Sequence, residues 1–327
     1  MENNETLLYS KYAAYAEHVA LAGFFATAVF GCTLIYLTIF GVTRNFGSYK
    51  KLLVTFAFFG IFFASCEVVL TLNVYSHNAG WIFYTASRPF NLSQASMSWL
   101  LSFYTGSYSL TTSMLSIQFV YRYWAIFDEA KLHIFESRRY FICLFLVSLF
   151  AVQWAIGMHY FLEFDDYSMS YFKTEMLQKF SLNISEIAGV ALVAYASDGS
   201  LRWWNISCNV NMTWIMGIQY TIIIYCAYQM QLKMEAKLQM LSTSMRTLHK
   251  QFYKTLILQI VTPTFTLFSP IMVVNNLPFL NLKLDFPSGI LLCALTIYPA
   301  LDAIIVMYVV QDYRKAIESE KTSMSQV

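Results

Sequence analysis

Seven long apolar stretches make up about half of this 327-residue chain, at 19–42, 52–74, 98–121, 141–162, 208–230, 255–277 and 288–310. Each stretch holds 22 to 24 residues, and about 20 helical residues suffice to cross the ~30 Å hydrocarbon core of a bilayer. Only 12% of the residues are charged, whereas soluble proteins average about 25%. The sequence therefore predicts an all-α membrane protein, in which seven transmembrane helices form one bundle.

The segments that connect the seven stretches differ in charge. Segments 43–51, 122–140, 231–254 and 311–327 contain 15 of the 21 Lys and Arg, and segments 1–18, 75–97, 163–207 and 278–287 contain the other 6. Because basic loops stay in the cytosol, the charges predict an outer tail at 1–18 and a cytosolic tail at 311–327. Seven spans in this orientation are the topology of a G-protein-coupled receptor in the plasma membrane.

Glycosylation sequons agree with that orientation. Five Asn-X-Ser/Thr sequences fall on the predicted outer side, at Asn4, Asn91, Asn183, Asn205 and Asn211. The outer segments are also the longer ones, so this agreement is supportive. The first four asparagines are the predicted glycosylation sites.

Side chains that carry chemistry are sparse. Five of the six cysteines lie within spans, and only Cys208 lies near the predicted outer surface, so no disulfide is expected. The spacings of Cys and His match no metal motif, and no nucleophile lies beside a base. The sequence predicts no catalytic residue, no metal or other cofactor, and no nucleic-acid partner.

Two carboxylates lie inside the spans, at Glu67 and Asp302. Ionised groups in a membrane usually face the bundle interior and have a function. For both residues an interhelical hydrogen-bond network is one interpretation. The alternatives are ligand binding for Glu67 and conformational switching for Asp302.

Two spans have features that affect packing and bending. The third span carries nine Ser and Thr between 98 and 116, which favours close helix packing, and its outer half could also line a ligand cavity. Pro263 and Pro270 interrupt the sixth span and Pro299 the seventh, so both should kink. We interpret Pro263 as a pivot.

Two connecting segments are long enough to have functions of their own. Segment 229–254 alternates apolar and basic residues, as in an amphipathic helix. Such a helix is either held at anionic lipid or docks a G protein. The outer segment 163–207 contains a short apolar run at 187–196, and we expect it to form a lid.

Several short motifs occur in the order and at the helix ends typical of one family. They are NFGSYKKLL at 45–53, SCE at 65–67 followed by His77, FVYRYWAI at 119–126, LHKQFYK at 248–254 followed by Gln259, YPALD at 298–302 and YRKAI at 313–317. Together they resemble the nematode serpentine chemoreceptors of the Str type. The resemblance implies a chemosensory receptor for an odorant-like small molecule, coupled to a heterotrimeric G protein, in the ciliary membrane of a sensory neuron.

The resemblance and the kinks together place coupling and switching at the inner side. The residues concerned are Arg122, Tyr121, Tyr123, Lys254, Pro263, Tyr298, Pro299 and Asp302. Rhodopsin-like receptors carry an acid before the arginine that ends the third span, whereas here Tyr121 precedes Arg122. Another group must therefore hold the guanidinium.

A ligand cavity is expected between the outer halves of the second, third, fifth, sixth and seventh spans. Its predicted lining is Glu67, Phe103, Ser107, Trp214, Phe265, Phe268 and Ile290. Apolar walls with a few hydroxyls suit a small, weakly polar molecule. A seven-span ligand-gated channel or a small-molecule transporter is the alternative, but the spans hold only two acids and no basic partner to form a charged pathway.

Overall fold

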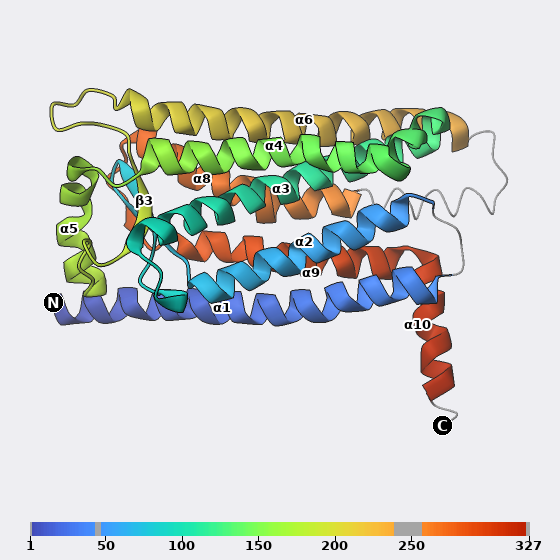
Figure 1. Cartoon of the computed structure of the whole chain (residues 1–327), viewed down its shortest axis with the longest axis horizontal. Helices are drawn as coiled ribbons and strands as arrows, with labels where there is room; N and C mark the ends of the chain where they lie inside the picture. The colour runs from blue at the N-terminus through green and yellow to red at the C-terminus, as the bar shows by residue number, and fades with distance from the viewer. Residues whose placement is uncertain (1, 43–46, 239–256, 325–327) are drawn as a thin grey trace.

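The computed structural model describes residues 2–42, 47–238 and 257–324, and its long helices run side by side along one axis (Figure 1). Five helical segments in these ranges are long and apolar enough to cross a membrane, namely Lys11–Gly41, Tyr49–Leu70, Arg138–Leu162, Trp203–Lys233 and Ile257–Leu280. The Ser- and Thr-rich helix α3 (Gln94–Phe127) and helix α9 (Gly289–Val309) complete the bundle. The helical bundle matches the fold class that the sequence predicts.

Most helices extend beyond the predicted spans. Their bounds are α1 (Glu2–Tyr36), continued by a π-helical turn η1 (Leu37–Gly41), α2 (Tyr49–Leu70), α4 (Ser137–Leu162) and α6 (Trp203–Leu238), with short 3₁₀ turns η2 (Pro89–Asn91) and η3 (Glu129–Phe135) flanking α3. Segment 1–18 was expected to be a tail, but from Glu2 it continues α1. No Gly or Pro precedes Gly23 to stop the helix.

Helix α3 lies against three others, as its small side chains predicted. A Cβ on Gly106 would lie 2.7 Å from the carbonyl oxygen of Ala151 on α4, so only glycine permits this approach. On another face, Thr112 donates a hydrogen bond of 2.7 Å to Oε1 of Gln219 on α6. The hydroxyls of α3 therefore stabilise helix contacts.

One end of the bundle carries a small sheet, which the apolar pattern of the sequence does not predict. Its strands are β1 (Asn73–His77), β2 (Gly80–Thr85), β3 (Ala188–Val193) and β4 (Asp285–Phe286), in the antiparallel order β3-β2-β1-β4. Helix α5 (Asp166–Phe180) covers this sheet with an apolar face that includes Phe172 and Met176. We call the sheet and α5 the cap, and its side of the bundle the cap end (Figure 1).

Segment 163–207 thus supplies α5 and β3, which pack with the β1–β2 hairpin in the cap. Residues 188–193 of the run at 187–196 form β3, because the valines suit a strand and the segment pairs in register with β2.

The sixth span is irregular where its prolines occur. Residues 257–263 are helical, a wider π-helical turn η4 (Thr264–Phe268) follows Pro263, and α8 (Ser269–Asn276) begins with Pro270 in its first turn. A 3₁₀ turn η5 (Leu277–Leu280) ends the span. At the end opposite the cap, α10 (Gln311–Met324) bends away from α9 by 85° (Figure 1). We call this the α10 end.

Candidate functional site

A cavity lies where the cap meets the bundle, with a volume of about 80 Å³. This volume exceeds the volume needed to hold one water molecule. The surface of the cavity is mostly apolar. The bundle contributes Ala16, Glu67, Tyr104, Thr105, Tyr108, Trp154, Met158, Met212, Ile271, Val274, Asn275, Gly289, Leu292 and Leu295, and the β1–β2 region contributes Leu72, Val74, Trp81 and Phe83. The hairpin therefore closes the cavity from the cap end.

Glu67 is the one carboxylate among the described lining residues, and both of its oxygens accept hydrogen bonds. Oε2 accepts from the Tyr104 hydroxyl at 3.1 Å, and Oε1 accepts from Oγ1 of Thr296 at 2.7 Å. These bonds join α2 to α3 and α9. The interhelical network expected for Glu67 is present, and it lies in the cavity wall.

Arg122 forms a second polar network, near the α10 end. Its guanidinium donates from Nε to the Tyr49 hydroxyl at 2.9 Å and from Nη1 to Oε1 of Gln259. Nε2 of Gln259 in turn donates to Oδ1 of Asp302 at 3.2 Å. Arg122, Gln259 and Asp302 are all buried. This chain of contacts, which we call the Arg122 network, connects α2, α3, the Ile257–Leu280 span and α9.

The Arg122 network shows what holds the guanidinium although Tyr121, rather than an acid, precedes Arg122. The guanidinium lies over the Tyr49 ring, with 5.4 Å from its carbon to the ring centroid. Asp302 is linked to Arg122 indirectly, because the Gln259 amide forms hydrogen bonds with both side chains. Among the described residues, Oδ2 of Asp302 and the hydroxyl of the neighbouring Tyr298 have no hydrogen-bond partner, so the network retains unused polar atoms.

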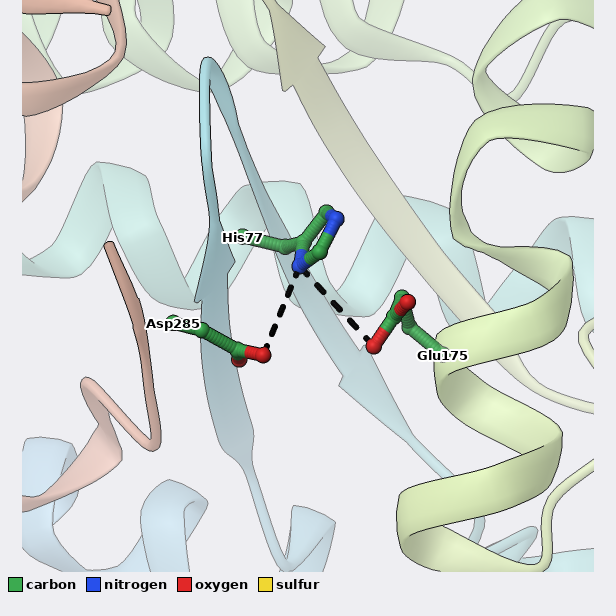
Figure 2. A group of neighbouring side chains, drawn as sticks. All are labelled: His77, Glu175 and Asp285. Atoms are coloured by element: carbon green, nitrogen blue, oxygen red, sulfur yellow. Dashed lines mark ion pairs between the residues drawn. The ribbon is translucent and has the colours of Figure 1, made fainter. Parts of the chain in front are cut away.

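A third cluster ties the cap together. Tyr75 and His77 point to the same face of β1, since alternate residues of a strand share a face. Asp285 of β4 pairs with His77 in register, and Glu175 and Lys179 lie one turn apart on α5. Figure 2 shows His77 of β1 between the two carboxylates. Its Nδ1 lies 3.7 Å from Oδ2 of Asp285 and 3.8 Å from Oε2 of Glu175.

Lys179 supplies the cation of this cap cluster. Its ammonium lies 2.8 Å from Oε2 of Glu175 and also pairs with Asp285. The Tyr75 hydroxyl donates to Oδ1 of Asp285 at 2.5 Å. The donor atoms of His77, Glu175 and Asp285 lie within 4.8 Å of one another, close enough to hold a metal ion. Because Lys179 already contacts both carboxylates, a metal would have to displace an internal ion pair, and we infer no metal site.

Comparisons with known proteins decide the family. Residues 16–318 match the family model for the serpentine-type 7TM GPCR chemoreceptor Str. The chain belongs to the Str family of serpentine chemoreceptors. It is 32% identical over 305 residues to G-protein coupled receptor str-33 of Caenorhabditis elegans, an alignment that covers 91% of this chain and 88% of that protein. It is 25% identical over 280 residues to serpentine receptor class r-10 of the same species, covering 84% and 81%.

A solved structure supports the fold. Squid rhodopsin superposes with a TM-score of 0.62 at 14% identity, over 98% of this chain and 87% of that one. The protein is therefore a multi-pass membrane receptor of the Str family with the rhodopsin-like helix bundle. As a member of this receptor family it is not an enzyme.

Of the predicted ligand-binding residues that the structure describes, Glu67 is the one that lines the cavity. The side chains of Phe103, Trp214 and Phe265 are instead 56%, 67% and 68% exposed on the outside of the bundle, so their assignment to the cavity is wrong. Ser107 is buried and donates to the carbonyl of Phe103 at 3.0 Å, and Phe268 packs on Tyr220 with ring centroids 4.6 Å apart. Neither lines the cavity, and the Ile290 side chain lies outside the described structure.

The errors follow from the membrane environment of the helices. In water, the apolar face of a helix marks the core, but lipid-facing residues are as apolar as buried ones. The sequence therefore did not show which way each span is rotated. The polar residues Tyr104, Tyr108 and Asn275 were the better signal, because polar groups within spans face the interior. None of these three was among the predicted lining residues.

Two of the predicted switching residues contact the partners of Arg122, since Asp302 accepts a hydrogen bond from Gln259 and Tyr121 stacks on Tyr49. The Tyr121 and Tyr49 ring centroids are 5.3 Å apart, and Pro299 packs against α2, where a Cβ on Gly60 would lie 2.7 Å from its Cβ. Tyr123 lies to one side, where its hydroxyl accepts from Lys233 at 2.9 Å. Gln259 and Tyr49, which bridge this group, were not among the predicted site residues. Lys254 and most of segment 229–254 lie outside the described residues.

The glycosylation sites divide into two groups. Asn91 and Asn183 are exposed at the cap end, which suits an acceptor. Asn205 is buried inside α6 with its Nδ2 donating to the carbonyl of Phe161 at 2.9 Å, so its prediction as an acceptor is wrong. Asn211 also lies within α6, where its Oδ1 accepts from Gln153 at 2.6 Å. The Asn4 side chain lies outside the described structure.

We expect the cap to loosen on mild acidification. Burial lowers the pKa of His77 below its ordinary value of 6.5, against the opposing charge of Glu175. The folded cap thus favours neutral His77, and this contribution to stability is complete above pH 6.5 and is lost as the pH falls below it. Amide hydrogen exchange in 73–85, corrected for the intrinsic pH dependence, should be faster at pH 5.5 than at pH 7.5.

A histidine substitution separates this effect from general acid destabilisation. His77→Gln should remove most of the change between pH 7.5 and 5.5, whereas His133→Gln in η3 at the α10 end should leave it intact. Glu175 does not account for titration in this window. Burial alone would raise its pKa, but Lys179 and His77 hold the pKa below its ordinary value of 4.5. An unchanged pH response in His77→Gln would refute the assignment.

Proposed function

We propose that this Str receptor binds a small, weakly polar molecule in the cavity under the cap and activates a heterotrimeric G protein at the α10 end. The observation that carries the proposal is the Arg122 network, which joins four helices through buried polar contacts. Buried networks of this kind have discrete bonded and broken arrangements. The bonded arrangement is the resting state in this proposal, and breaking it opens a cleft for the G protein.

One span touches both sites. Ile271, Val274 and Asn275 of α8 line the cavity, and Gln259 lies on the same span in the Arg122 network. At 1.5 Å per helical residue, Asn275 and Gln259 are about 24 Å apart. The π-helical turn η4 after Pro263 lies between them. A ligand that shifts α8 can therefore move Gln259 by pivoting the span at this irregular turn.

Two side chains of neighbouring helices hold the pivot. The Tyr108 hydroxyl of α3 donates to the carbonyl of Leu267 at 3.1 Å, and the Tyr220 hydroxyl of α6 lies 2.9 Å from Oγ1 of Thr264. Tyr108 also lines the cavity. It therefore offers a direct contact between bound ligand and the irregular turn.

The cap end faces outward in this proposal. Helix α10 and the described parts of the basic connecting segments lie at the opposite end, which the positive-inside rule assigns to the cytosol. Glycosylation mapping tests this orientation. Asn183→Gln should abolish a glycan shift at that position, while sequons engineered into segment 231–254 stay unmodified. Labelling of 231–254 from outside intact cells would contradict the orientation.

A functional screen tests receptor activity itself. Cells expressing the chain are exposed to volatile and water-soluble chemicals while calcium and membrane potential are recorded. An agonist response should disappear when a G-protein inhibitor is present. A current that persists under the inhibitor would favour the alternative of a ligand-gated channel. The family further favours a ciliary location in a chemosensory neuron, which fluorescent tagging in the native animal would test.

A further inference from the structure

Most polar side chains in the cavity wall are already satisfied by the protein. Glu67 accepts two hydrogen bonds, the Tyr108 hydroxyl donates to the Leu267 carbonyl, and Oγ1 of Thr105 donates to the Ser102 carbonyl at 2.7 Å. Because these groups already form hydrogen bonds within the protein, they gain little from a further bond to a ligand. The polar contact that a ligand makes must therefore come from elsewhere in the wall.

Asn275 differs from these residues. Its side chain is only 6% exposed, it lines the cavity, and its carboxamide forms no hydrogen bond with any residue in the described ranges. The adjacent Asn276 shows the contrast, because its Nδ2 donates to the carbonyl of Met272 at 2.8 Å and its Oδ1 lies 3.4 Å from Nδ2 of Asn209. A buried carboxamide normally finds partners. Asn275 is therefore a polar group in the cavity wall whose carboxamide is available to bind a ligand.

The unused groups of the wall are mainly donors. A carboxamide offers two N–H donors and one carbonyl acceptor. The indole nitrogens of Trp81 and Trp154 in the same wall are buried and lack acceptors among the described residues. These indoles are covered by neighbouring atoms, so the Asn275 amide is the group within reach. Most of the unpaired polar atoms of the wall are therefore N–H donors, which a ligand would satisfy with a hydrogen-bond acceptor.

The charges of the wall exclude strongly charged ligands. The described lining residues include no basic side chain to pair with an anion, and the one carboxylate, Glu67, is engaged by two hydroxyls. The remaining wall is apolar, with Val74, Leu292 and Leu295 among its side chains. A neutral molecule with a short hydrocarbon body fits this surface.

We propose that the cavity selects a small neutral molecule with a hydrogen-bond-accepting oxygen, and that the Asn275 carboxamide donates to that oxygen. This inference rests on the proposed function only in taking the cavity as the ligand site. Asn275 then determines specificity for the polar group, while the apolar wall selects the size and shape of the hydrocarbon. A ketone, ester or ether of a few carbons has this chemistry.

Direct binding to the purified full-length receptor in lipid nanodiscs tests the proposal without a G protein. The probes are pentan-2-one, pentane, pentylamine and pentanoate, which differ in the polar group on a five-carbon body. Pentan-2-one should bind about 3- to 10-fold more tightly than pentane, as expected for one net hydrogen bond. Tighter binding of pentylamine or pentanoate, or no binding of pentan-2-one up to about 10 mM, would overturn the proposal.

Two leucine variants assign the preference to the residue. Asn275→Leu should bind pentane at least as well as the unmodified receptor but lose the preference for the ketone, and retained pentane binding shows that the cavity is intact. The control Asn276→Leu should keep the preference. If Asn275→Leu keeps it too, Asn275 is not the recognition group. Selective ketone binding without a G-protein response in cells would refute the proposed function and leave this inference standing.

Discussion

Arg122→Ala should abolish agonist-dependent signalling, with a loss of at least about tenfold in maximal response at matched surface expression. Loss of the contacts to Tyr49 and Gln259 would by itself favour the active state. The guanidinium, which alanine removes, is the group expected to engage the G protein once the network has opened. It also stands at the end of α3 where a cytosolic cleft would open. The measurement is calcium release as a function of agonist concentration, normalised to receptor at the cell surface.

Two further variants make the Arg122 result interpretable. Arg122→Lys retains the positive charge but not the planar fork of donors, and it should recover only part of the response. Arg88→Ala is the control, because Arg88 is exposed at the cap end and donates to the carbonyl of Glu186 at 2.8 Å. Normal signalling by Arg122→Ala would mean that Arg122 only anchors α3 at the membrane interface.

Gln259→Leu should raise signalling in the absence of agonist. The Gln259 amide is the bridge between Arg122 and Asp302, and leucine of similar size breaks both hydrogen bonds. Hydrogen bonds to charged groups are worth about 1.5–3 kcal/mol, and about 1.4 kcal/mol corresponds to a tenfold shift between two states. Basal activity should therefore increase by roughly tenfold or more, measured without added ligand at matched surface expression.

Gln219→Leu is the matched control for Gln259→Leu. Gln219 is also a buried glutamine that joins helices, since its amide bonds to Thr112 and to Ser113 of α3 at 2.7 Å each. It lies outside the Arg122 network. Its replacement should lower expression without raising basal activity, because it weakens packing rather than a switch. Equal basal activation by both variants would mean that any loss of helix contact activates the receptor.

The helical bundle of membrane-spanning length could be predicted from the sequence for a physical reason. A bilayer demands about 20 apolar residues per helix whatever the neighbouring helices do. The polar and small side chains of α3 likewise predicted close packing. Ser, Thr and Gly allow neighbouring helices to approach closely and stabilise their contacts, but they contribute little at a lipid-facing surface. Gly106 against Ala151 is an instance of that contact.

The cap was beyond sequence reasoning because its strands are short and come from three separate segments. A five- or six-residue apolar run such as 188–193 reads equally well as part of a buried helix. Only the pairing with β2 makes it a strand. The same holds for His77, Glu175 and Asp285, which the fold brings together although more than 90 residues separate each from the next.

By itself, the sequence determined that this chain is a seven-span bundle, which family it resembles, and that Arg122 must have an unusual partner. Those properties depend on composition, charge distribution and local motifs. The tertiary structure alone decided that the partners are Tyr49 and Gln259, and that Tyr104 and Asn275 rather than Phe103 and Phe265 face the cavity. Successive residues of a helix point about 100° apart around its axis. Because side chains that face lipid are as apolar as buried ones, the sequence does not show which side of an apolar helix faces the cavity.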